Sequence, residues 1–473
     1  MCGIIAVISK KNDKNEHILM PLVEGLTALQ HRGQDSCGIV TCSDNELYLK
    51  KEKEAVYKAF EVINEADLPG RMGIGHTRYA TQGGGSILDS QPLLTKTHPK
   101  ISIAHNGNIT NYFKLKKEII EDGMQIETSI DSEVILRLFA KEYDSHGDFF
   151  KAVETILNKV KGAYSVVGII AGKGIFAFRD SLGIRPLVLG KFEDSYAFAS
   201  ETVSFQMMDF EFVRDIKPGE AVFIPFKGDI ESKEITNKPH AHCMFEWIYF
   251  ASPSSMIEGR SVYKSRLALG ALLAEQLNSS KIDLVIPVPD SGRTAAIKLS
   301  EDTGIRYREG LIKERHIQRT FIMASQKMRE RAVRKKLSPI MSILKDQNIA
   351  VVDDSIVRGT TSKRIVQTMK TAGVKNVTFI SACPPIRYPC YYGIDMSHTK
   401  EFIATNRTIE QIRDYLTADD LIYANNEDII KAIRRNVCMA CLTGKYPEEV
   451  TKEEKEQLAG QRIESQLTLK NKE

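Results

Sequence analysis

The sequence predicts an α+β domain in its N-terminal half and an α/β domain with a mostly parallel sheet in its C-terminal half. In the first half, apolar strand-like runs are separated by tight polar turns; examples are residues 164–170, 174–179, 196–200 and 221–224. From about residue 261 onward, strand-like and helix-like patterns alternate, which indicates a parallel sheet covered by helices. A length of 473 residues is enough for two to four domains.

Composition and charge exclude several classes of protein. Hydrophobic residues make up 42% and charged residues 27% of the chain, as in an ordinary globular protein. A net charge of +4 gives no reason to expect a nucleic-acid partner. No apolar run approaches the ~20 residues of a membrane helix, and the first residues lack the basic region and cleavage site of a signal peptide. We therefore expect a cytoplasmic protein whose eight cysteines are thiols, ligands or nucleophiles.

The first reactive side chain is that of Cys2, which precedes Gly3 and an apolar strand-like run at 4–8. Removal of Met1 before a small residue would leave Cys2 with a free α-amino group. Such a group has a pKa near ~8 and can take the thiol proton directly or through water, which is the chemistry of an N-terminal nucleophile. The alternative is a small buried cysteine in a first strand, and Cys2 alone slightly favours this alternative.

Four further segments change that balance. They are QHRGQD at 30–35, GIGHTRYAT at 73–81, HNGN at 105–108 and TSIDSEV at 128–134. Together with Cys2-Gly3-Ile4 they resemble the glutamine amidotransferase domain of the N-terminal-nucleophile hydrolase fold. The run FRDSLGIRPL at 178–187 resembles the same family but departs from it at Ser181 and Leu182. The resemblance covers the N-terminal half and implies αββα layers there.

This resemblance also implies a role for each polar residue of the site. The side chain of Asn106 and the N–H of Gly107 would form the oxyanion hole, where losing one donor typically costs ~3–4 kcal/mol of barrier. The α-carboxylate of glutamine requires a forked cation, and Arg78 fits. The α-ammonium requires an acid, and Asp131 fits. Arg32 is expected to shape the same glutamine-binding pocket.

A second site is indicated by NIAVVDDSIVRGTTSK at 348–363. Four apolar residues predict a buried strand, Asp353 and Asp354 follow it, and a glycine-containing turn leads into a helix that Gly373 would end. The N–H groups of such a turn and helix start can hold a phosphate, while the two acids suit sugar hydroxyls or a cation. The run is not a P-loop, because GxxxxGK[ST] is absent. An ordinary strand–helix connection is the alternative.

The same run resembles the phosphoribosyl-pyrophosphate (PRPP) binding motif of the type I phosphoribosyltransferases. PVPDSG at 287–292 follows another predicted strand, and in that family it is the pyrophosphate loop. Both segments lie where ligands of parallel sheets bind, at the carboxyl ends of strands. The resemblance implies one Mg²⁺ held by Ser291, Asp353 and Asp354. The implied PRPP contacts are Asp290, Ser291, Lys313, Arg319, Asp353, Asp354, Arg358, Gly359, Thr360, Thr361 and Ser362, and the last five would hold the 5-phosphate.

A basic segment lies between the two PRPP motifs and ends in QKMRERAVRKK at 326–336. As a nucleic-acid patch it is short and the overall charge is balanced. As a lid it would supply cations to the pyrophosphate leaving group. It resembles the lid of glutamine PRPP amidotransferases, except that Glu314 and His316 stand where asparagine and tyrosine are common. A solvated helix face is the alternative.

The pair Cys438 and Cys441 has metal-ligand spacing. Two distant thiols would complete a site, but spacing alone does not choose between Cys383 and Cys390, or between zinc and iron–sulfur. The contexts HCMFEWIYFA, PCYYGID and CMACLTGKYP resemble the cluster-bearing class of glutamine PRPP amidotransferases. That resemblance implies a [4Fe-4S] cluster with a structural role, bound by Cys243, Cys390, Cys438 and Cys441.

The chain as a whole resembles the glutamine PRPP amidotransferase family. We expect an amidotransferase domain at 2–235, a phosphoribosyltransferase domain at 236–445 and a charged helical tail at 446–473. The run FEWIYF at 245–250 is predicted to be an aromatic strand, with Trp247 in packing.

The resemblance implies that glutamine is hydrolysed and that ammonia passes to PRPP, giving 5-phosphoribosylamine, glutamate and pyrophosphate at the start of purine synthesis. It further implies a homotetramer and inhibition by purine nucleotides, with no nucleic acid or membrane partner. Another amidotransferase would lack the acid–acid–RGTT run. A purine repressor would need a DNA-binding module and no nucleophile.

Overall fold

The computed structural model describes residues 1–11, 17–62, 64–79, 86–313, 337–396, 399 and 402–470, with side chains to residue 461. Arg319 and the lid prediction at 314–336 lie outside these residues, as does the end of the 73–81 motif. Across the described ranges, no helix has both the length and the apolar character needed to cross a membrane.

The N-terminal half contains two antiparallel sheets. The spatial order of the first is β11 (Glu211–Asp215), β9 (Val188–Phe192), β10 (Ser195–Ala199), β1 (Gly3–Ser9), β4 (Met72–Arg78), β2 (Ser36–Ser43) and β3 (Glu46–Glu52). The order of the second is β13 (Glu231–Glu234), β12 (Glu220–Pro225), β8 (Gly174–Arg179), β7 (Gly162–Ile170), β6 (Ile101–Ile109) and β5 (Leu93–Leu94). One buried apolar cluster joins Ile4 and Ile8 of the first sheet to Val167 and Ile175 of the second, so the sheets pack face to face.

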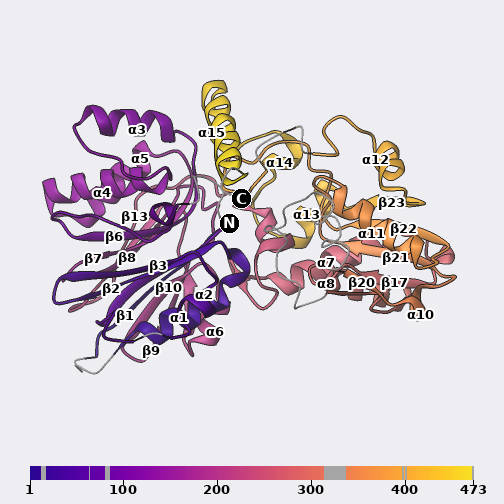
Figure 1. The fold of residues 1–473 in the computed structure, drawn as a ribbon, viewed down its shortest axis with the longest axis horizontal. Helices are drawn as coiled ribbons and strands as arrows, with labels where there is room; N and C mark the ends of the chain where they lie inside the picture. The colour runs from indigo at the N-terminus through magenta and orange to yellow at the C-terminus, as the bar shows by residue number, and fades with distance from the viewer. Residues whose placement is uncertain are drawn as a thin grey trace.

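Helices cover the outer face of each sheet. The first sheet carries α1 (Leu19–Ala28), α2 (Val56–Ala59) and α6 (Val203–Met207), and the second carries α3 (Tyr112–Glu121), α4 (Ser132–His146) and α5 (Phe149–Lys159). Alternation within β1 explains this packing, because Ile5 and Val7 face α1 while Ile4 and Ile8 face the other sheet. Figure 1 shows the resulting αββα layers, which confirms the predicted fold.

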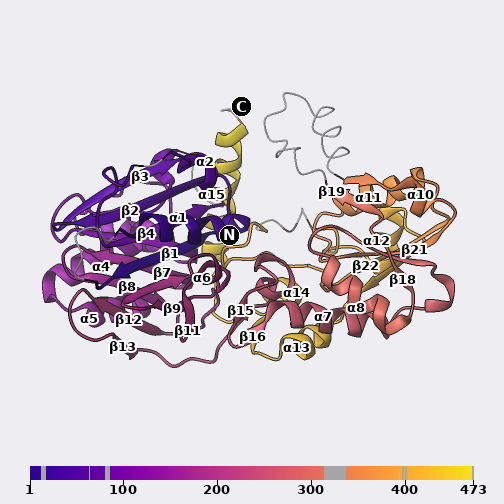
Figure 2. The same cartoon turned by 90° about the horizontal axis from the view of Figure 1, so that it is seen from below.

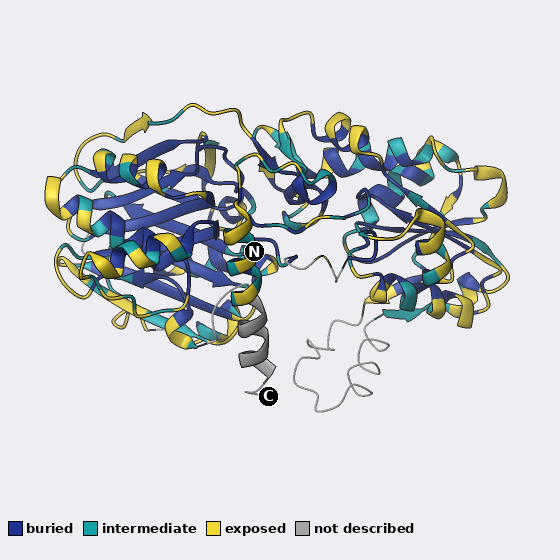
Figure 3. Cartoon of the chain, turned by 90° about the horizontal axis from the view of Figure 1, so that it is seen from above, coloured by how far each residue is buried: buried dark blue, intermediate teal, exposed yellow. Residues whose placement is uncertain are grey.

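The C-terminal half contains a five-stranded sheet in which every neighbouring pair is parallel. Its order is β18 (Arg306–Tyr307), β17 (Leu284–Pro287), β21 (Asn348–Asp353), β22 (Asn376–Ser381) and β23 (Asp420–Tyr423). One face packs on α11 (Thr360–Thr371) and α12 (Ile409–Leu416), and the other on α7 (Val262–Ala274) and α8 (Arg293–Thr303). The predicted α/β domain is confirmed, and its central strands β17, β21 and β22 are largely buried (Figure 3).

Short elements connect these parts. They are η1 (Gln30–Arg32), η2 (Ile87–Asp89), β14 (His242–Cys243), β15 (Met256–Ile257), β16 (Arg260–Ser261), η4 (Ser279–Lys281), β19 (Leu311–Lys313), β20 (Leu337–Pro339), α10 (Met341–Leu344), α13 (Asn426–Ile433), β24 (Val437–Cys438) and α14 (Ala440–Thr443). The tail forms α15 (Lys452–Lys470), which stands beside the junction of the two halves (Figure 2).

The strand prediction for 245–250 is wrong. Residues Glu246–Phe250 form a single π-helical turn, η3. Aromatic residues favour strands only where a partner strand accepts them. Here the turn buries Trp247 and Ile248 in an apolar cluster and directs Glu246 to buried arginines, which an extended segment with alternating faces would not do.

Candidate active sites

Cys2 immediately precedes β1, the central strand of the first sheet, and is half-buried. Its backbone nitrogen donates to Oδ1 of Asn106 on β6 of the second sheet, at 3.2 Å. The register that pairs Gly3 with Thr77 puts Arg78 beside Cys2 in the first sheet. The two facing sheets therefore bring together the predicted nucleophile, the predicted oxyanion donor and the predicted carboxylate-binding arginine.

Asn106 is fully buried, and within the part of the chain that the structure describes its Nδ2 has no hydrogen-bond partner. Such an orphaned donor costs about 1–3 kcal/mol unless a ligand accepts its hydrogens. Gly107 follows with φ +154°, and a Cβ there would lie 1.8 Å from the carbonyl oxygen of Ala163. A side chain is thus excluded next to the orphaned amide. The arrangement can stabilise a negative charge that develops beside Cys2.

Asp131 immediately precedes α4 and is buried. Its Oδ2 accepts from the N–H of Ile109 at 2.9 Å, and its Oδ1 lies 4.0 Å from Nδ1 of His105. Burial lowers the pKa of His105, although Asp131 opposes the shift, so this imidazole is neutral at pH 7. Lys51 lies near Arg78, and burial and then the Arg78 charge lower its pKa to about 8. Among the described residues, His105 is the one ion-pair partner recorded for Asp131, so its carboxylate can receive an ammonium group.

Arg32 is engaged by protein groups on all sides. Its Nε donates to the carbonyl oxygen of Cys2 at 2.9 Å, and its guanidinium forks onto Glu246 at 2.9 and 3.0 Å while Nη1 also donates to Glu201. Burial alone would raise the pKa of Glu201, but His31 and Arg32 lower it far below its usual range. Arg32 therefore holds the backbone of Cys2 through its carbonyl oxygen. Its predicted contact with glutamine stays a prediction.

Sequence reasoning missed the contribution of Glu246. A lone acid inside the aromatic run FEWIYF is the one local signal that marks it. Buried carboxylates need partners, so this acid predicts buried arginines, which the structure provides in Arg32 and Arg185. Arg32 and Arg185 lie 214 and 61 residues before Glu246, so the local sequence around Glu246 could not identify them.

The PRPP motifs meet at the carboxyl ends of β17 and β21. Ser291 donates to Asp354, as does Ser355 at 2.5 Å, and the N–H of Asp354 donates to Asp353 Oδ1 at 2.9 Å. Burial raises the pKa of both aspartates, and for Asp353 the neighbouring Asp354 raises it further. Clustered carboxylate and hydroxyl oxygens are the ligands that Mg²⁺ prefers, so Ser291, Asp353 and Asp354 fit the predicted ion.

The predicted phosphate-binding end lies at the start of α11. Gly359 has φ +74°, and a Cβ there would lie 2.4 Å from Cδ1 of Ile403. This turn leaves the N–H groups of Thr360, Thr361 and Ser362 in the first helical turn, where anions bind. Arg358 beside them is exposed.

The predicted pyrophosphate contacts also meet. Asp290 accepts from Nζ of Lys313 and from Nη1 of Arg293, each at 2.8 Å. Lys313 is thereby placed next to the loop that starts α8. Arg319 cannot be located, because it lies outside the described residues.

The four predicted cluster cysteines gather at the junction of the two halves. Cys243 on β14 and Cys438 on β24 are paired in register. Cys441 belongs to the buried apolar cluster that contains Cys243, and Cys390 packs against that cluster. Burial and then Glu246 and Cys390 raise the pKa of Cys243 to about 11, against the charge of Arg185. Cys383 is also near Cys441.

All four thiols are free. Among the described side chains, no group of three or more His, Cys, Asp or Glu has the geometry of a metal site. Four clustered thiols beside an arginine fit an iron–sulfur cluster. The thiolates that bind several irons lie further apart than the thiolates that bind a single metal ion.

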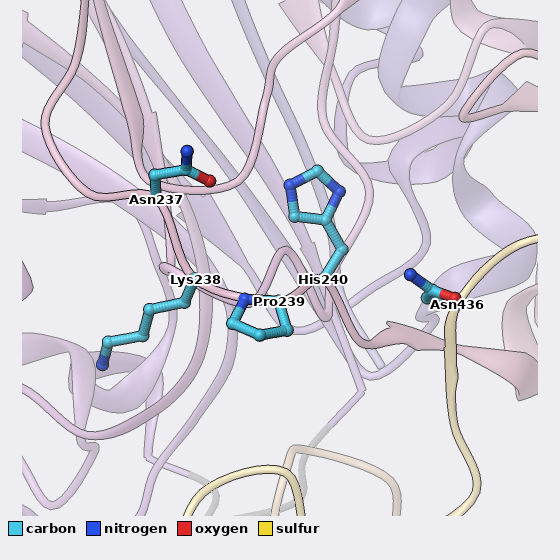
Figure 4. Close-up of a pocket in the computed structure, with 5 residues that line it drawn as sticks. All are labelled: Asn237, Lys238, Pro239, His240 and Asn436. Atoms are coloured by element: carbon cyan, nitrogen blue, oxygen red, sulfur yellow. The ribbon is translucent and has the colours of Figure 1, made fainter.

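A surface hollow of about 440 Å³ lies at the connection between the halves, beside the β14–β24 pair that carries Cys243 and Cys438. Asn237, Lys238, Pro239, His240 and Asn436 line it, and Lys238 points away from His240 (Figure 4). These side chains share no catalytic arrangement.

Comparison with known proteins decides the family. The glutamine amidotransferase domain family matches residues 76–207. The amidophosphoribosyltransferase of Pseudomonas aeruginosa is 43% identical over 450 residues, covering 92% of this chain and 89% of the relative. That of Methanocaldococcus jannaschii is 42% identical over 468 residues, covering 95% and 98%. The chain belongs to the amidophosphoribosyltransferase family.

A solved amidophosphoribosyltransferase has the same fold. The B. subtilis glutamine PRPP amidotransferase complexed with ADP and GMP is 36% identical, with a TM-score of 0.88, and the match covers 96% of this chain and 98% of that one. The predicted family and the predicted order of an amidotransferase-type half before a parallel-sheet half are therefore confirmed. The cluster-bearing class stays a prediction.

Proposed function

We propose that this amidophosphoribosyltransferase makes 5-phosphoribosylamine, glutamate and pyrophosphate from glutamine, PRPP and water, as the first step of purine synthesis. One observation carries the proposal. A single chain holds an orphaned buried amide facing Cys2 and, in its other half, paired aspartates at the carboxyl end of a parallel sheet. The first site suits amide hydrolysis and the second suits a phosphorylated ribose.

In the amidotransferase half, Met1 is removed and the nitrogen of Cys2 becomes an α-amino group that takes the thiol proton. The thiolate attacks the amide carbon of glutamine, and Asn106 Nδ2 with the N–H of Gly107 holds the resulting oxyanion. On collapse, the α-ammonium group of Cys2 returns its proton to the amide nitrogen, the C–N bond breaks, ammonia leaves and a glutamyl thioester remains. Water then hydrolyses the thioester to glutamate and restores the thiol. Arg78 and Asp131 hold the α-carboxylate and α-ammonium groups of glutamine.

In the phosphoribosyltransferase half, ammonia attacks C1 of PRPP and pyrophosphate leaves. Asp353 and Asp354 hold ribose hydroxyls, residues 358–362 hold the 5-phosphate, and Asp290, Lys313 and Arg319 lie on the pyrophosphate side. When bound, Mg²⁺ would offset the charge of the pyrophosphate, and Ser291, Asp353 and Asp354 would hold it. The C1 centre is cationic in the transition state, so carboxylates nearby favour it electrostatically.

Ammonia in water at pH 7 is protonated and ceases to be a nucleophile, so we propose a closed passage between the sites. Turnover of amide-¹⁵N-labelled glutamine with PRPP and Mg²⁺, in excess unlabelled ammonium, tests function and passage together. We expect one pyrophosphate per glutamate and label retained in the product. A product carrying mainly unlabelled nitrogen would contradict the passage, and no pyrophosphate release would contradict the function.

Several finer features belong to the same proposal. A domain boundary at 235 is supported by β13, the last strand of the two large antiparallel sheets, which ends at Glu234. A second boundary at 445 is proposed with it. A [4Fe-4S] cluster on Cys243, Cys390, Cys438 and Cys441 would tie the tail to the junction. Inhibition by purine nucleotides is supported by the ADP and GMP bound to the solved relative. A homotetramer in the cytoplasm completes the proposal.

A further inference from the structure

Gly107, whose N–H we assign to the oxyanion hole, is in close contact with two other backbone segments. The first is β7, because a Cβ on Gly107 would lie 1.8 Å from the carbonyl oxygen of Ala163. The second belongs to the C-terminal half, because a Cβ on Gly393 would lie 2.8 Å from the carbonyl oxygen of Gly107. Residues 391–393, here called the backing segment, therefore pack directly against the residue that carries the oxyanion donor.

Asn108, the next residue of β6, is hydrogen-bonded to the backing segment. Its Nδ2 donates to the carbonyl oxygen of Tyr391 at 2.8 Å, although 283 residues separate the two in sequence. Asn108 is buried, so water competes little for this bond. Since Asn108 shares a peptide group with Gly107, a bond that holds its side chain also restricts the backbone torsions of Gly107.

The backing segment is tied to the N-terminal half at two further points. Nε and Nη2 of the fully buried Arg185 both donate to the carbonyl oxygen of Tyr392, the first at 2.9 Å. Oη of Tyr392 donates to the carbonyl oxygen of Glu448 at 3.0 Å. Oε2 of Glu448 in turn accepts from the N–H of Gly162 at 2.9 Å, and Gly162 pairs with Ile109 at the end of β6. The segment therefore cannot shift without breaking bonds to the half that contains Gly107.

A glycine that carries a catalytic N–H needs such support. Gly107 has φ +154°, which residues with side chains rarely adopt, and an unsupported glycine has many other torsions open to it. An oxyanion donor stabilises the transition state only if it is already oriented when the negative charge develops. A displacement of about 1 Å within a site can lower the rate by about 10²-fold. The bond from Asn108 and the contact with Gly393 prevent such a displacement.

We propose that Asn108 is a positioning residue for the N–H of Gly107, and that the backing segment of the C-terminal half completes the oxyanion hole of the N-terminal half. Asn108 acts through the peptide group that it shares with Gly107. The support comes from contacts within the chain and does not depend on whether the PRPP site is occupied. The inference rests on the proposed function.

The test measures kcat and KM for glutamine hydrolysis by full-length Asn108→Ala. We expect kcat to fall by roughly 10–100-fold and KM to stay within about twofold of wild type, because the displaced donor acts on the transition state. Alkylation of Cys2 by iodoacetamide forms no oxyanion, so its rate should stay within about twofold of wild type. Pyrophosphate release from PRPP with ammonia should be equally unaffected, since it uses the other half.

Asn111→Ala is the matched control for this variant. The side-chain amide of Asn111 also binds backbone groups, at Lys159 and Lys161, but none in the backing segment. We expect it to lower Tm and to leave kcat for glutamine hydrolysis unchanged.

Gly393→Ala provides a second variant if Asn108→Ala does not fold, as judged by circular dichroism. Its Cβ would press on the carbonyl group of Gly107, so we expect the same loss of kcat with unchanged KM. The control is Gly304→Ala. Gly304 has φ +72°, close to the +98° of Gly393, but among the described residues a Cβ there would meet no atom within 4 Å beyond the adjoining helix. It should lower Tm alone.

A wild-type kcat in folded Asn108→Ala or Gly393→Ala would overturn the inference. A loss confined to KM would also overturn it. So would a loss of Cys2 alkylation or of the ammonia-dependent reaction in the same proportion as kcat, because the damage would then extend beyond the oxyanion hole. A wild type that hydrolyses no glutamine would overturn the proposed function itself.

Discussion

The backbone nitrogen of Cys2 lies 3.2 Å from Oδ1 of Asn106, and this contact fixes which way the side-chain amide of Asn106 points. A flipped amide would set its own donor against the N–H of Cys2. Nδ2 is therefore left over, buried and without a partner among the described residues. The nucleophile thus orients the donor that we assign to its oxyanion.

The first prediction follows from this pair. Asn106→Ala should lower kcat for glutamine hydrolysis by about 10²–10³-fold with little change in KM, because the donor acts on the transition state. Synthesis from PRPP and ammonia, measured as pyrophosphate release, should persist. Asn111→Ala is the control, since both ends of that amide bind backbone of 159–161 and its loss should lower Tm without changing kcat. Unchanged hydrolysis in Asn106→Ala would remove the oxyanion assignment.

The second prediction concerns protons at the PRPP site. Burial raises the pKa of Asp353 and Asp354, and the neighbouring acid raises that of Asp353 further, so this pair holds a proton to higher pH than an ordinary aspartate and a cation competes with that proton. Binding of PRPP with Mg²⁺ should release this proton and tighten as pH rises through the raised pKa. Calorimetry in two buffers of different ionisation enthalpy measures the release.

Asp353→Asn is the matched variant for that measurement. It should abolish the release and weaken binding by roughly tenfold or more, the usual loss for a charge-assisted contact. Proton uptake on binding, or an unchanged release in the variant, would contradict the assignment.

The third prediction separates two cysteines. If Cys390 is a cluster ligand, Cys390→Ala purified without oxygen should contain little iron and lose the brown iron–sulfur absorption. Cys383→Ala is the control, because Cys383 is fully buried and lies near Cys441 but is not assigned as a ligand. The iron content and the visible absorption spectrum of the two variants are measured and compared. Loss of iron in Cys383→Ala with full iron in Cys390→Ala would reverse the ligand assignment.

The fourth prediction concerns stability and pH. Burial and then Glu258 raise the pKa of Asp215 to about 6, although its carboxylate accepts from the N–H of Glu258 at 2.9 Å. Because this pKa is above the ordinary value, the stabilisation from Asp215 is complete below about pH 4 and is lost as pH rises through about 6.

Asp215→Asn cannot ionise, so Tm of this variant minus Tm of wild type should increase from pH 4 to pH 7.5. The increase should correspond to on the order of 1 kcal/mol. Thermal unfolding followed by circular dichroism at both pH values measures it. A Tm difference that stays constant with pH would show that the pKa of Asp215 is not raised.

Local sequence patterns predicted those parts of the structure that are determined by residues close together in the sequence. Four apolar residues followed by Asp353 and Asp354 predicted β21 and its acidic end, and the glycine turn predicted the start of α11. Gly373, the predicted stop, follows that helix with φ +85°. These features depend on neighbours within a few residues, so a single sequence contains them.

Other parts depend on distant partners and were not predictable in this way. The run FEWIYF has the composition of a strand but forms a turn, because Glu246 binds Arg32, 214 residues earlier. The same distance hid the role of Arg32 behind Cys2. The meeting of Cys2 with Asn106 was expected only because the motifs resemble a family, since 104 residues separate them.

The most direct test of the account compares nitrogen donors in Cys2→Ala. Pyrophosphate release from PRPP and Mg²⁺ is measured with glutamine and, separately, with ammonia at pH 8.5 for wild type and variant. We predict that Cys2→Ala loses release with glutamine and keeps the wild-type rate with ammonia within about twofold, because the two reactions use separate sites. Undiminished release with glutamine in Cys2→Ala, or no release with ammonia in wild type, would contradict the account.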